Sequence, residues 1–175
     1  MPSRLRVVFG YAAGVIVLLL ARPTPRSLLV ALPFALLGEG LRLWASGHIE
    51  KTQRLATGGP YAHTRNPLYL GSATIALAVA AACASAAVAA CVALYLAAFY
   101  PSVMREESAF LRRKFADEYE AWAREVPMFL PRLTPGGPRS TRFDWGRVRV
   151  NREWRTAAAL PFVGLLLFVR GYLRF

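Results

Sequence analysis

One uncharged stretch limits the possible folds of this 175-residue chain more than any other feature. Residues 68–104, 37 in succession, include no Asp, Glu, Lys or Arg. As a single helix they would extend about 55 Å at a rise of about 1.5 Å per residue, whereas the hydrocarbon core of a bilayer is about 30 Å thick. The stretch therefore predicts two membrane-spanning helices joined by a tight turn at the small residues 81–86. The many alanines would let these two helices pack closely.

Three further apolar segments complete a predicted bundle of five spans. The spans lie near residues 7–21, 27–44, 68–82, 86–104 and 156–175. The first could instead be a signal peptide, but Leu19 and Ala21 make a poor cleavage site, so a retained span is favoured. The last contains Pro161 and Arg170, and is the weakest of the five. The fold class we expect is all-α: a single polytopic transmembrane domain over residues 1–175.

The distribution of charge predicts the topology. The chain is 55% hydrophobic yet has a net charge of +12. Most of its Lys and Arg residues lie in 45–66 and 105–155, which the predicted hairpin places on one side of the membrane. Basic loops remain in the cytoplasm, so these two regions are expected there, with the amino terminus on the same side and the carboxyl terminus outside.

The basic residues flank spans and accompany no nucleic-acid-binding motif, so anionic lipid headgroups are the expected partner and nucleic acid is not. Cys83 and Cys91 lie inside the apolar hairpin and are expected to be structural thiols. His48 and His63 are not at ligand spacing, so no metal site is expected. The sequence does not indicate the oligomeric state.

The loop before the third span contains the first candidate for chemistry. Asn66 is predicted to cap that helix with Pro67 at its first position, because Pro biases the preceding residue away from helical angles. The helix would then begin at the membrane surface, where its amide groups and Arg65 favour an anionic ligand. The alternative is a structural helix entry in which Tyr61 and Tyr69 contact the interface.

A second polar cluster follows the fourth span. Two adjacent carboxylates at a membrane boundary, Glu106 and Glu107, are costly without a partner. The alternative is a solvated helix end paired with Arg residues. Beyond them, Leu111, Phe115, Tyr119 and Trp122 recur at helical spacing. The pattern predicts an amphipathic helix over 108–125 that lies on the membrane or against the bundle.

Taken together, the motifs over residues 36–135 resemble the isoprenylcysteine carboxyl methyltransferase family, whose superfamily includes the phospholipid N-methyltransferases. The motifs are Gly59-Pro60-Tyr61, Arg65-Asn66-Pro67-x-Tyr69-x-Gly71, Glu106-Glu107, Phe115-x-x-x-Tyr119-x-x-Trp122 and Val126-Pro127-x-x-x-Pro131-Arg132. Eukaryotic members have His in place of Asn66, whereas Asn is common in the bacterial branch. The segment 151–154 also resembles that branch, which implies a bacterial inner membrane protein without an assured prenyl-protein specificity.

The resemblance implies S-adenosylmethionine as cofactor, in a pocket formed by the two cytoplasmic regions. The expected cofactor-binding residues are Tyr61, His63, Arg65, Asn66, Pro67, Tyr69, Leu70, Glu106, Glu107 and Tyr119. The acceptor would be lipid-like and arrive from the bilayer between helices. O-methylation of a carboxylate on a prenylated or other lipid-like substrate is favoured, and N-methylation of a phospholipid or other amine is the alternative.

The candidate catalytic residues follow from the acceptor's chemistry. A carboxylate acceptor needs only an orienting cation, for which Arg132 is the first candidate and Arg65 the second. An amine must lose a proton, and Glu107 would be the base. Two other functions stay open: an NADPH-dependent membrane reductase of the sterol type, whose helical core is related, and a non-catalytic membrane adaptor.

Overall fold

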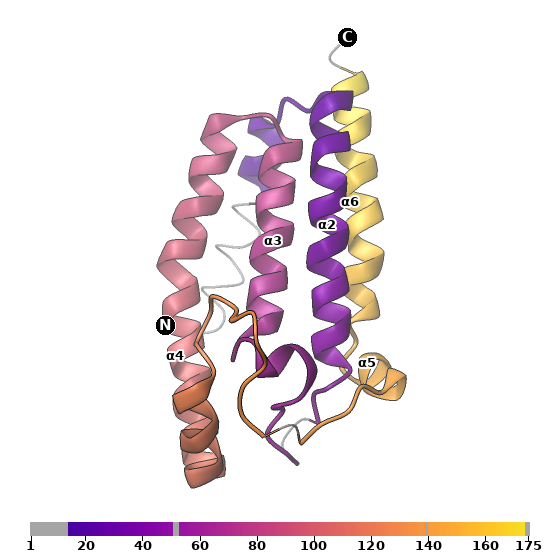
Figure 1. Ribbon diagram of the computed structural model, residues 1–175. Helices are drawn as coiled ribbons and strands as arrows, with labels where there is room; N and C mark the ends of the chain where they lie inside the picture. Colours follow the sequence, from indigo (N-terminus) through magenta and orange to yellow (C-terminus); the bar gives the residue numbers. More distant parts are fainter. Residues whose placement is uncertain (1–13, 51–52, 139, 174–175) are drawn as a thin grey trace.

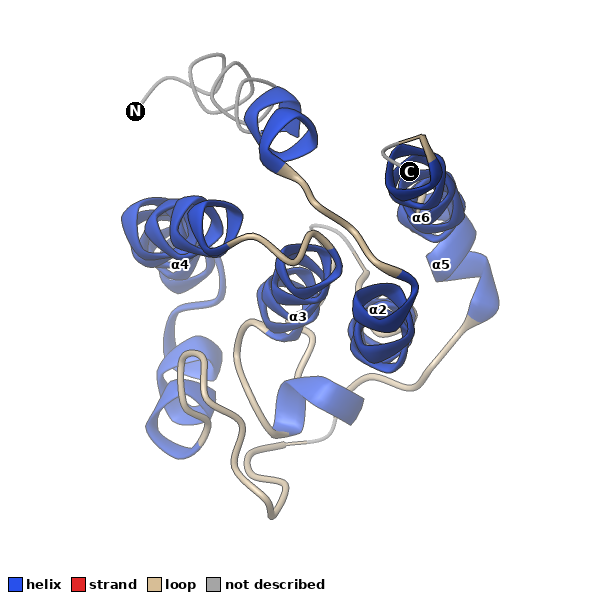
Figure 2. Ribbon diagram, turned by 90° about the horizontal axis from the view of Figure 1, so that it is seen from above, coloured by secondary structure: helices blue, strands red, loops and turns tan. Residues whose placement is uncertain are grey.

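The computed structural model describes residues 14–50, 53–138 and 140–173, and all regular structure in them is helical. Residues 14–20 are helical, followed by α2 (Pro25–Ser46), η1 (Gly59–Ala62), α3 (Pro67–Ala82), α4 (Ala86–Glu125), α5 (Trp145–Val150) and α6 (Trp154–Tyr172). Helices α4, α3, α2 and α6 stand side by side in that order, as seen from the side (Figure 1) and from above (Figure 2). The all-helical fold class is confirmed.

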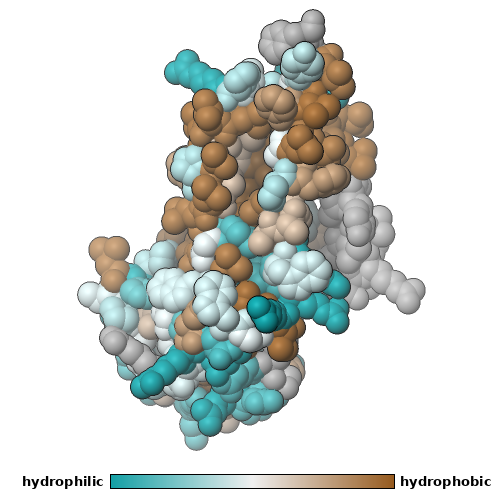
Figure 3. All heavy atoms as spheres, turned by 90° about the vertical axis from the view of Figure 1, so that its right-hand side faces the viewer, coloured by the Kyte–Doolittle hydropathy of each residue, from teal (hydrophilic) through white to brown (hydrophobic). Residues whose placement is uncertain are grey.

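Three of these helices, α2, α4 and α6, are long and apolar enough to cross a membrane, and α3 is a shorter apolar helix of 16 residues. Apolar side chains cover the upper part of the molecule, whereas polar side chains gather at the opposite end (Figure 3). The chain is therefore a helical membrane protein. We call the end formed by residues 47–66 and 105–153 the polar end. Of the first predicted span, 7–21, residues 7–13 lie outside the described residues and 14–20 are helical.

Helix α2 and helix α3 approach closely through two glycines. A Cβ added at Gly38 would lie 2.8 Å from the carbonyl oxygen of Gly71, and one at Gly71 would lie 2.6 Å from Cγ of Arg42. Small residues of this kind allow helices to pack in a membrane without a hydrophobic driving force. The contact fixes the position of Arg42 against the first turns of α3.

The turn between α3 and α4 falls within the stretch predicted at 81–86. Helix α3 ends at Ala82, and Ser85 caps α4 by accepting a hydrogen bond from the Val88 amide. Ala84 has a positive φ of 46°, a conformation that tight turns require. The hairpin brings the start of α3 and the middle of α4 to the same end of the bundle.

The predicted amphipathic helix is the continuation of α4, interrupted by non-helical angles at Ala116. Tyr119 and Trp122 are buried in a core with Ala45, Leu55 and Val126, and the Trp122 indole donates a hydrogen bond to the Tyr61 carbonyl oxygen at 3.1 Å. Leu111 and Phe115 pack against the same core. This face of the helix therefore packs on the protein's own loops.

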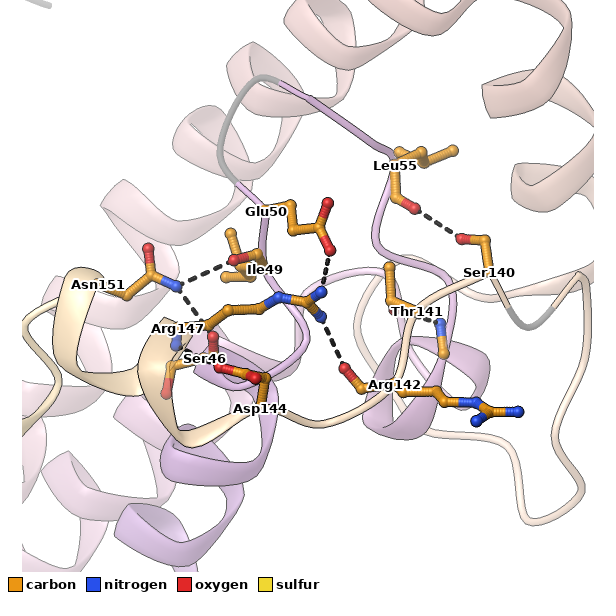
Figure 4. Close-up of polar contacts among 11 residues, drawn as sticks. Ser46, Ile49, Glu50, Leu55, Ser140, Thr141, Arg142, Asp144, Arg147 and Asn151 are labelled. Atoms are coloured by element: carbon orange, nitrogen blue, oxygen red, sulfur yellow. Dashed lines mark hydrogen bonds and ion pairs between the residues drawn. The ribbon is translucent and has the colours of Figure 1, made fainter.

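Residues 140–151, which include α5, hold residues 46–50 and 55–58 in place, as Figure 4 shows. The contacts are Ser140 Oγ to the Leu55 carbonyl (2.9 Å), the Gly58 amide to Thr141 Oγ1 (3.2 Å), Asn151 Nδ2 to the Ser46 carbonyl (2.9 Å) and an Arg147–Glu50 ion pair. These bonds join residues about 80 to 105 positions apart in sequence. They order a loop that carries part of the candidate site.

Candidate cofactor site at the polar end

The start of α3 is held by the segment after α4. Asn66 occupies the capping position with Pro67 first in the helix, as predicted, but its side chain does not cap the helix. Instead, Asn66 Nδ2 donates to the Met128 carbonyl at 2.8 Å, and the Arg65 amide donates to the Pro127 carbonyl at 2.9 Å. No side chain occupies the cap, so the helix end remains suited to an anionic group.

Two cavities adjoin at this helix start. The first, of about 310 Å³, is lined by Arg42, Tyr61, Arg65, Asn66, Pro67, Leu68, Tyr69, Ser72 and Glu107. The second, of about 230 Å³, is lined by Ile49, Glu50, Arg54, Leu55, Ala56, Tyr61, Arg65, Glu107, Phe110, Leu111, Lys114, Phe115 and Trp122. They share Tyr61, Arg65 and Glu107. A cation, a carboxyl group and an aromatic ring thus lie at the boundary of both cavities.

Arg65 is positioned by Tyr119 and has a hydrogen-bond donor that no described residue uses. Its Nη1 donates to the Tyr119 hydroxyl at 3.0 Å, and its guanidinium lies 6.0 Å from the centre of the Tyr119 ring. Its buried Nε has no hydrogen-bond partner among the described residues. Tyr119 lines neither cavity and acts on the site only through its contact with Arg65. A guanidinium with an unused buried donor favours an anionic ligand.

Glu107 lies on α4 where both cavities open. Burial raises the pKa of its carboxyl above the usual value, and a hydrogen bond from Tyr69 acts in the opposite direction. The residue as a whole is nevertheless exposed to solvent, which weakens the effect of burial on the carboxyl. Burial also raises the pKa of Tyr61, so this phenol stays protonated at neutral pH. Glu50 is paired with Arg147, so Glu107 is the carboxyl group of the cavity linings that is suited to accept a proton or a hydrogen bond from a ligand.

The structure adds Arg42 to the site. Its Nη2 lies 2.6 Å from Glu153 Oε1, and its Nη1 donates to Ser72 Oγ and to the Leu68 carbonyl. Arg42 and Glu153 are separated by 111 residues, so the sequence indicated the charge of each but not their pairing. The ion pair joins α2, α3 and the start of α6 beside the cavity.

Five of the residues assigned from the sequence line neither cavity: His63, Leu70, Glu106, Tyr119 and Arg132. His63 Nδ1 is 2.8 Å from the Arg132 carbonyl oxygen, and Arg132 Nη1 donates to the Glu125 carbonyl at 2.6 Å. The Arg132 guanidinium is thereby engaged in shaping the loop after α4. Among the two cations proposed from sequence to orient an acceptor, the structure places only Arg65 at the cavities.

The raised pKa of Glu107 predicts a pH-dependent effect on stability. The folded protein binds the Glu107 carboxyl proton more tightly than the unfolded chain does. Glu107 therefore lowers the free energy of unfolding as the pH rises above 4.5, the ordinary pKa of a glutamate. We expect Glu107→Gln to raise the melting temperature at neutral pH, by an amount that shrinks toward pH 4.5. Thermal unfolding in detergent across this range measures it.

Glu118→Gln, which removes an exposed carboxylate further along α4, is the matched control. It should show a smaller change with pH. Equal pH profiles for the two variants would contradict the assignment of a carboxyl with a raised pKa at position 107.

Comparison with known proteins identifies the family of this chain. The family model for phospholipid methyltransferases matches residues 27–118, more than half of the chain. The chain is similar to the cobalt-zinc-cadmium resistance protein CzcN of Cupriavidus metallidurans (36% identity over 134 residues, 75% of this chain and 60% of that protein). It is also similar to the nickel-cobalt-cadmium resistance protein NccN of Alcaligenes xylosoxydans xylosoxydans (39% identity over 95 residues, 53% of this chain and 44% of that protein).

The chain thus spans about half the length of these curated relatives. No solved structure shows significant similarity to it. The matched region contains α2, η1, α3 and α4 as far as residue 118, and with them Arg42, Arg65 and Glu107. The chain belongs to the phospholipid methyltransferase family, within the membrane methyltransferases similar to isoprenylcysteine carboxyl methyltransferase.

Proposed function

We propose that this protein transfers a methyl group from S-adenosylmethionine to a lipophilic acceptor. The observation that carries the proposal is the pair of adjoining cavities between which Arg65 and Glu107 stand. They lie at the polar end of a membrane bundle that belongs to a methyltransferase family. A water-soluble cofactor and a membrane-borne acceptor would meet at such a boundary.

The lining residues fit the groups of the cofactor. Its carboxylate suits Arg65 and the uncapped start of α3. Its ammonium or ribose hydroxyls suit Glu107, and aromatic faces such as Tyr61 and Phe110 suit a sulfonium or an adenine ring. When bound, the cofactor supplies an electrophilic methyl group. The protein's own task is to align the acceptor with that methyl and to exclude water.

The choice of acceptor atom depends on which residue faces it. A carboxylate acceptor requires an orienting cation. Of the two cations that line the first cavity, Arg42 is paired with Glu153, which leaves Arg65 for the acceptor. Transfer to an amine would require Glu107 to take up a proton. We favour O-methylation of a lipid-like carboxylate and keep N-methylation as the alternative. In the cell, we place the polar end in the cytoplasm, since it carries most of the basic residues.

Ligand-dependent stabilisation tests the cofactor assignment. We expect S-adenosylmethionine and its demethylated product to raise the melting temperature of the detergent-purified protein, because a ligand that binds only the folded state stabilises it. NADPH should have no effect. Stabilisation by NADPH alone would support a reductase, and stabilisation by none of the three would support an adaptor; either result would overturn the proposal.

The acceptor can then be identified by transfer of a labelled methyl group into a lipid extract. The two relatives are named for resistance to cobalt, zinc, cadmium and nickel, so extracts from cells grown with and without these metals form a useful pair. Labelled product that vanishes in an Arg65→Ala variant would link the chemistry to the cavities. Label that persists unchanged in this variant would contradict the site.

A further inference from the structure

A third cavity lies within the apolar part of the bundle. It has a volume of about 490 Å³ and is lined by α2, α3 and α6, with side chains such as Leu32, Ala78, Val163 and Leu167. It shares no lining residue with the two cavities at the polar end. We call it the apolar groove. Glu39, on α2, is the charged residue in its lining.

Glu39 is buried without a partner. Its exposed fraction is 7%, and neither carboxyl oxygen has a hydrogen-bond partner among the described residues. It precedes the end of α2 at Ser46 by seven residues, or about 10 Å of helix at about 1.5 Å per residue. A carboxyl group at such a depth in a membrane protein is costly unless something donates hydrogen bonds to it, and such residues mark ligand or ion sites.

Arg42 lies one helical turn after Glu39, but its guanidinium makes its hydrogen bonds to other residues. Its guanidinium bonds to Glu153, to Ser72 and to the Leu68 carbonyl. Glu153 adds a second negative charge to the neighbourhood, so the three side chains together favour a cation beside Glu39 rather than an anion. The missing partner of Glu39 is therefore a hydrogen-bond donor with positive charge.

We propose that the apolar groove binds a single-chain amphiphile with a primary ammonium head, with its chain in the groove and its ammonium on Glu39. An ammonium offers three donors and the opposite charge, whereas a hydroxyl offers one donor and no charge. A carboxylate or phosphate diester head would be repelled. This binding site goes beyond the proposed methyl transfer and does not depend on it.

Four probes with the same chain test the head group: dodecylamine, dodecyltrimethylammonium, dodecanol and dodecanoate. Binding to the protein in lipid nanodiscs would be measured by native mass spectrometry. We expect dodecylamine to bind at least about tenfold more tightly than the trimethylammonium probe, because only the amine combines charge with N–H donors; charge-assisted hydrogen bonds contribute this much. Glu39→Gln should abolish the difference, whereas Glu118→Gln, an exposed residue on α4, should preserve it.

Gly164→Leu tests the position of the chain. A Cβ at Gly164 meets no atom within 4 Å, and Gly164 lines the groove, so a larger side chain there begins in open space beside the groove. It should weaken dodecylamine binding yet preserve stabilisation by S-adenosylmethionine.

Three results would overturn the proposal. They are equal binding of all four probes, retention of the amine preference in Glu39→Gln, and unchanged amine binding in Gly164→Leu. A wild-type protein that does not bind S-adenosylmethionine would overturn only the methyltransferase proposal.

Discussion

Replacing Arg65 with Ala is expected to weaken the binding of S-adenosylmethionine by about ten- to a hundredfold. Arg65 lines both cavities at the polar end and has a buried Nε without a partner among the described residues. A hydrogen bond to a charged group contributes about 1.5–3 kcal/mol, and about 1.4 kcal/mol corresponds to a tenfold change in affinity. Isothermal titration of the detergent-purified protein with the cofactor measures the loss.

Two further variants separate a binding role from a structural one. Arg113→Ala removes an exposed arginine of α4 that lines neither cavity, so its affinity should match that of the wild type. Tyr119→Phe removes the hydroxyl that accepts the Arg65 hydrogen bond but keeps the buried ring. It should reduce affinity less than Arg65→Ala does. An Arg65→Ala protein that binds the cofactor with wild-type affinity would rule out the proposed site.

The second large effect concerns stability, and it distinguishes two glycines of the same helix. Gly38→Ala places a Cβ 2.8 Å from the Gly71 carbonyl oxygen, whereas a Cβ at Gly40 meets no atom within 4 Å. Crowding in a packed contact costs about 1–3 kcal/mol, whereas Ala in an open helical position gains up to about 1 kcal/mol over Gly. Gly38→Ala should therefore lower the melting temperature by several degrees, and Gly40→Ala should maintain or raise it.

The same pair of variants reports on the site. Because Arg42 lies against Gly71, separating α2 from α3 should also disturb the Arg42–Glu153 pair beside the cavity. Gly38→Ala should thus weaken cofactor binding in addition to lowering stability, whereas Gly40→Ala should leave binding unchanged. Identical melting temperatures for the two variants would contradict the close contact of α2 and α3.

Much of the polar end was predictable from local pattern. Pro67 sets the start of α3 through its fixed φ. The small residues at 81–86 allow the turn between α3 and α4. Tyr61, Arg65 and Glu107 were assigned to one site from their motifs, and the structure brings them to the same pair of cavities. Their convergence follows from a hairpin whose two helices leave and return at one membrane face.

Residues whose position depends on distant packing were not predictable in this way. Arg132 carries charge in a motif, but its guanidinium is used by the Glu125 carbonyl, a contact that no spacing rule indicates. The Asn66 side chain binds the Met128 carbonyl instead of its own helix, because the segment after α4 folds back over that helix start. In both cases a backbone carbonyl brought close by the fold offers a hydrogen bond that local sequence does not reveal.

The uncharged stretch at 68–104, by itself, determined that this protein is a helical membrane bundle that contains a helical hairpin. Backbone groups in lipid must be satisfied within the protein, and an unbroken apolar stretch of this length favours helices for that purpose. Only the tertiary structure decided that Arg42 pairs with Glu153, and that Glu39 stands without a partner in an apolar groove. Charge pairing depends on which helices are neighbours, and that is set by the packing of α2 against α3 and α6.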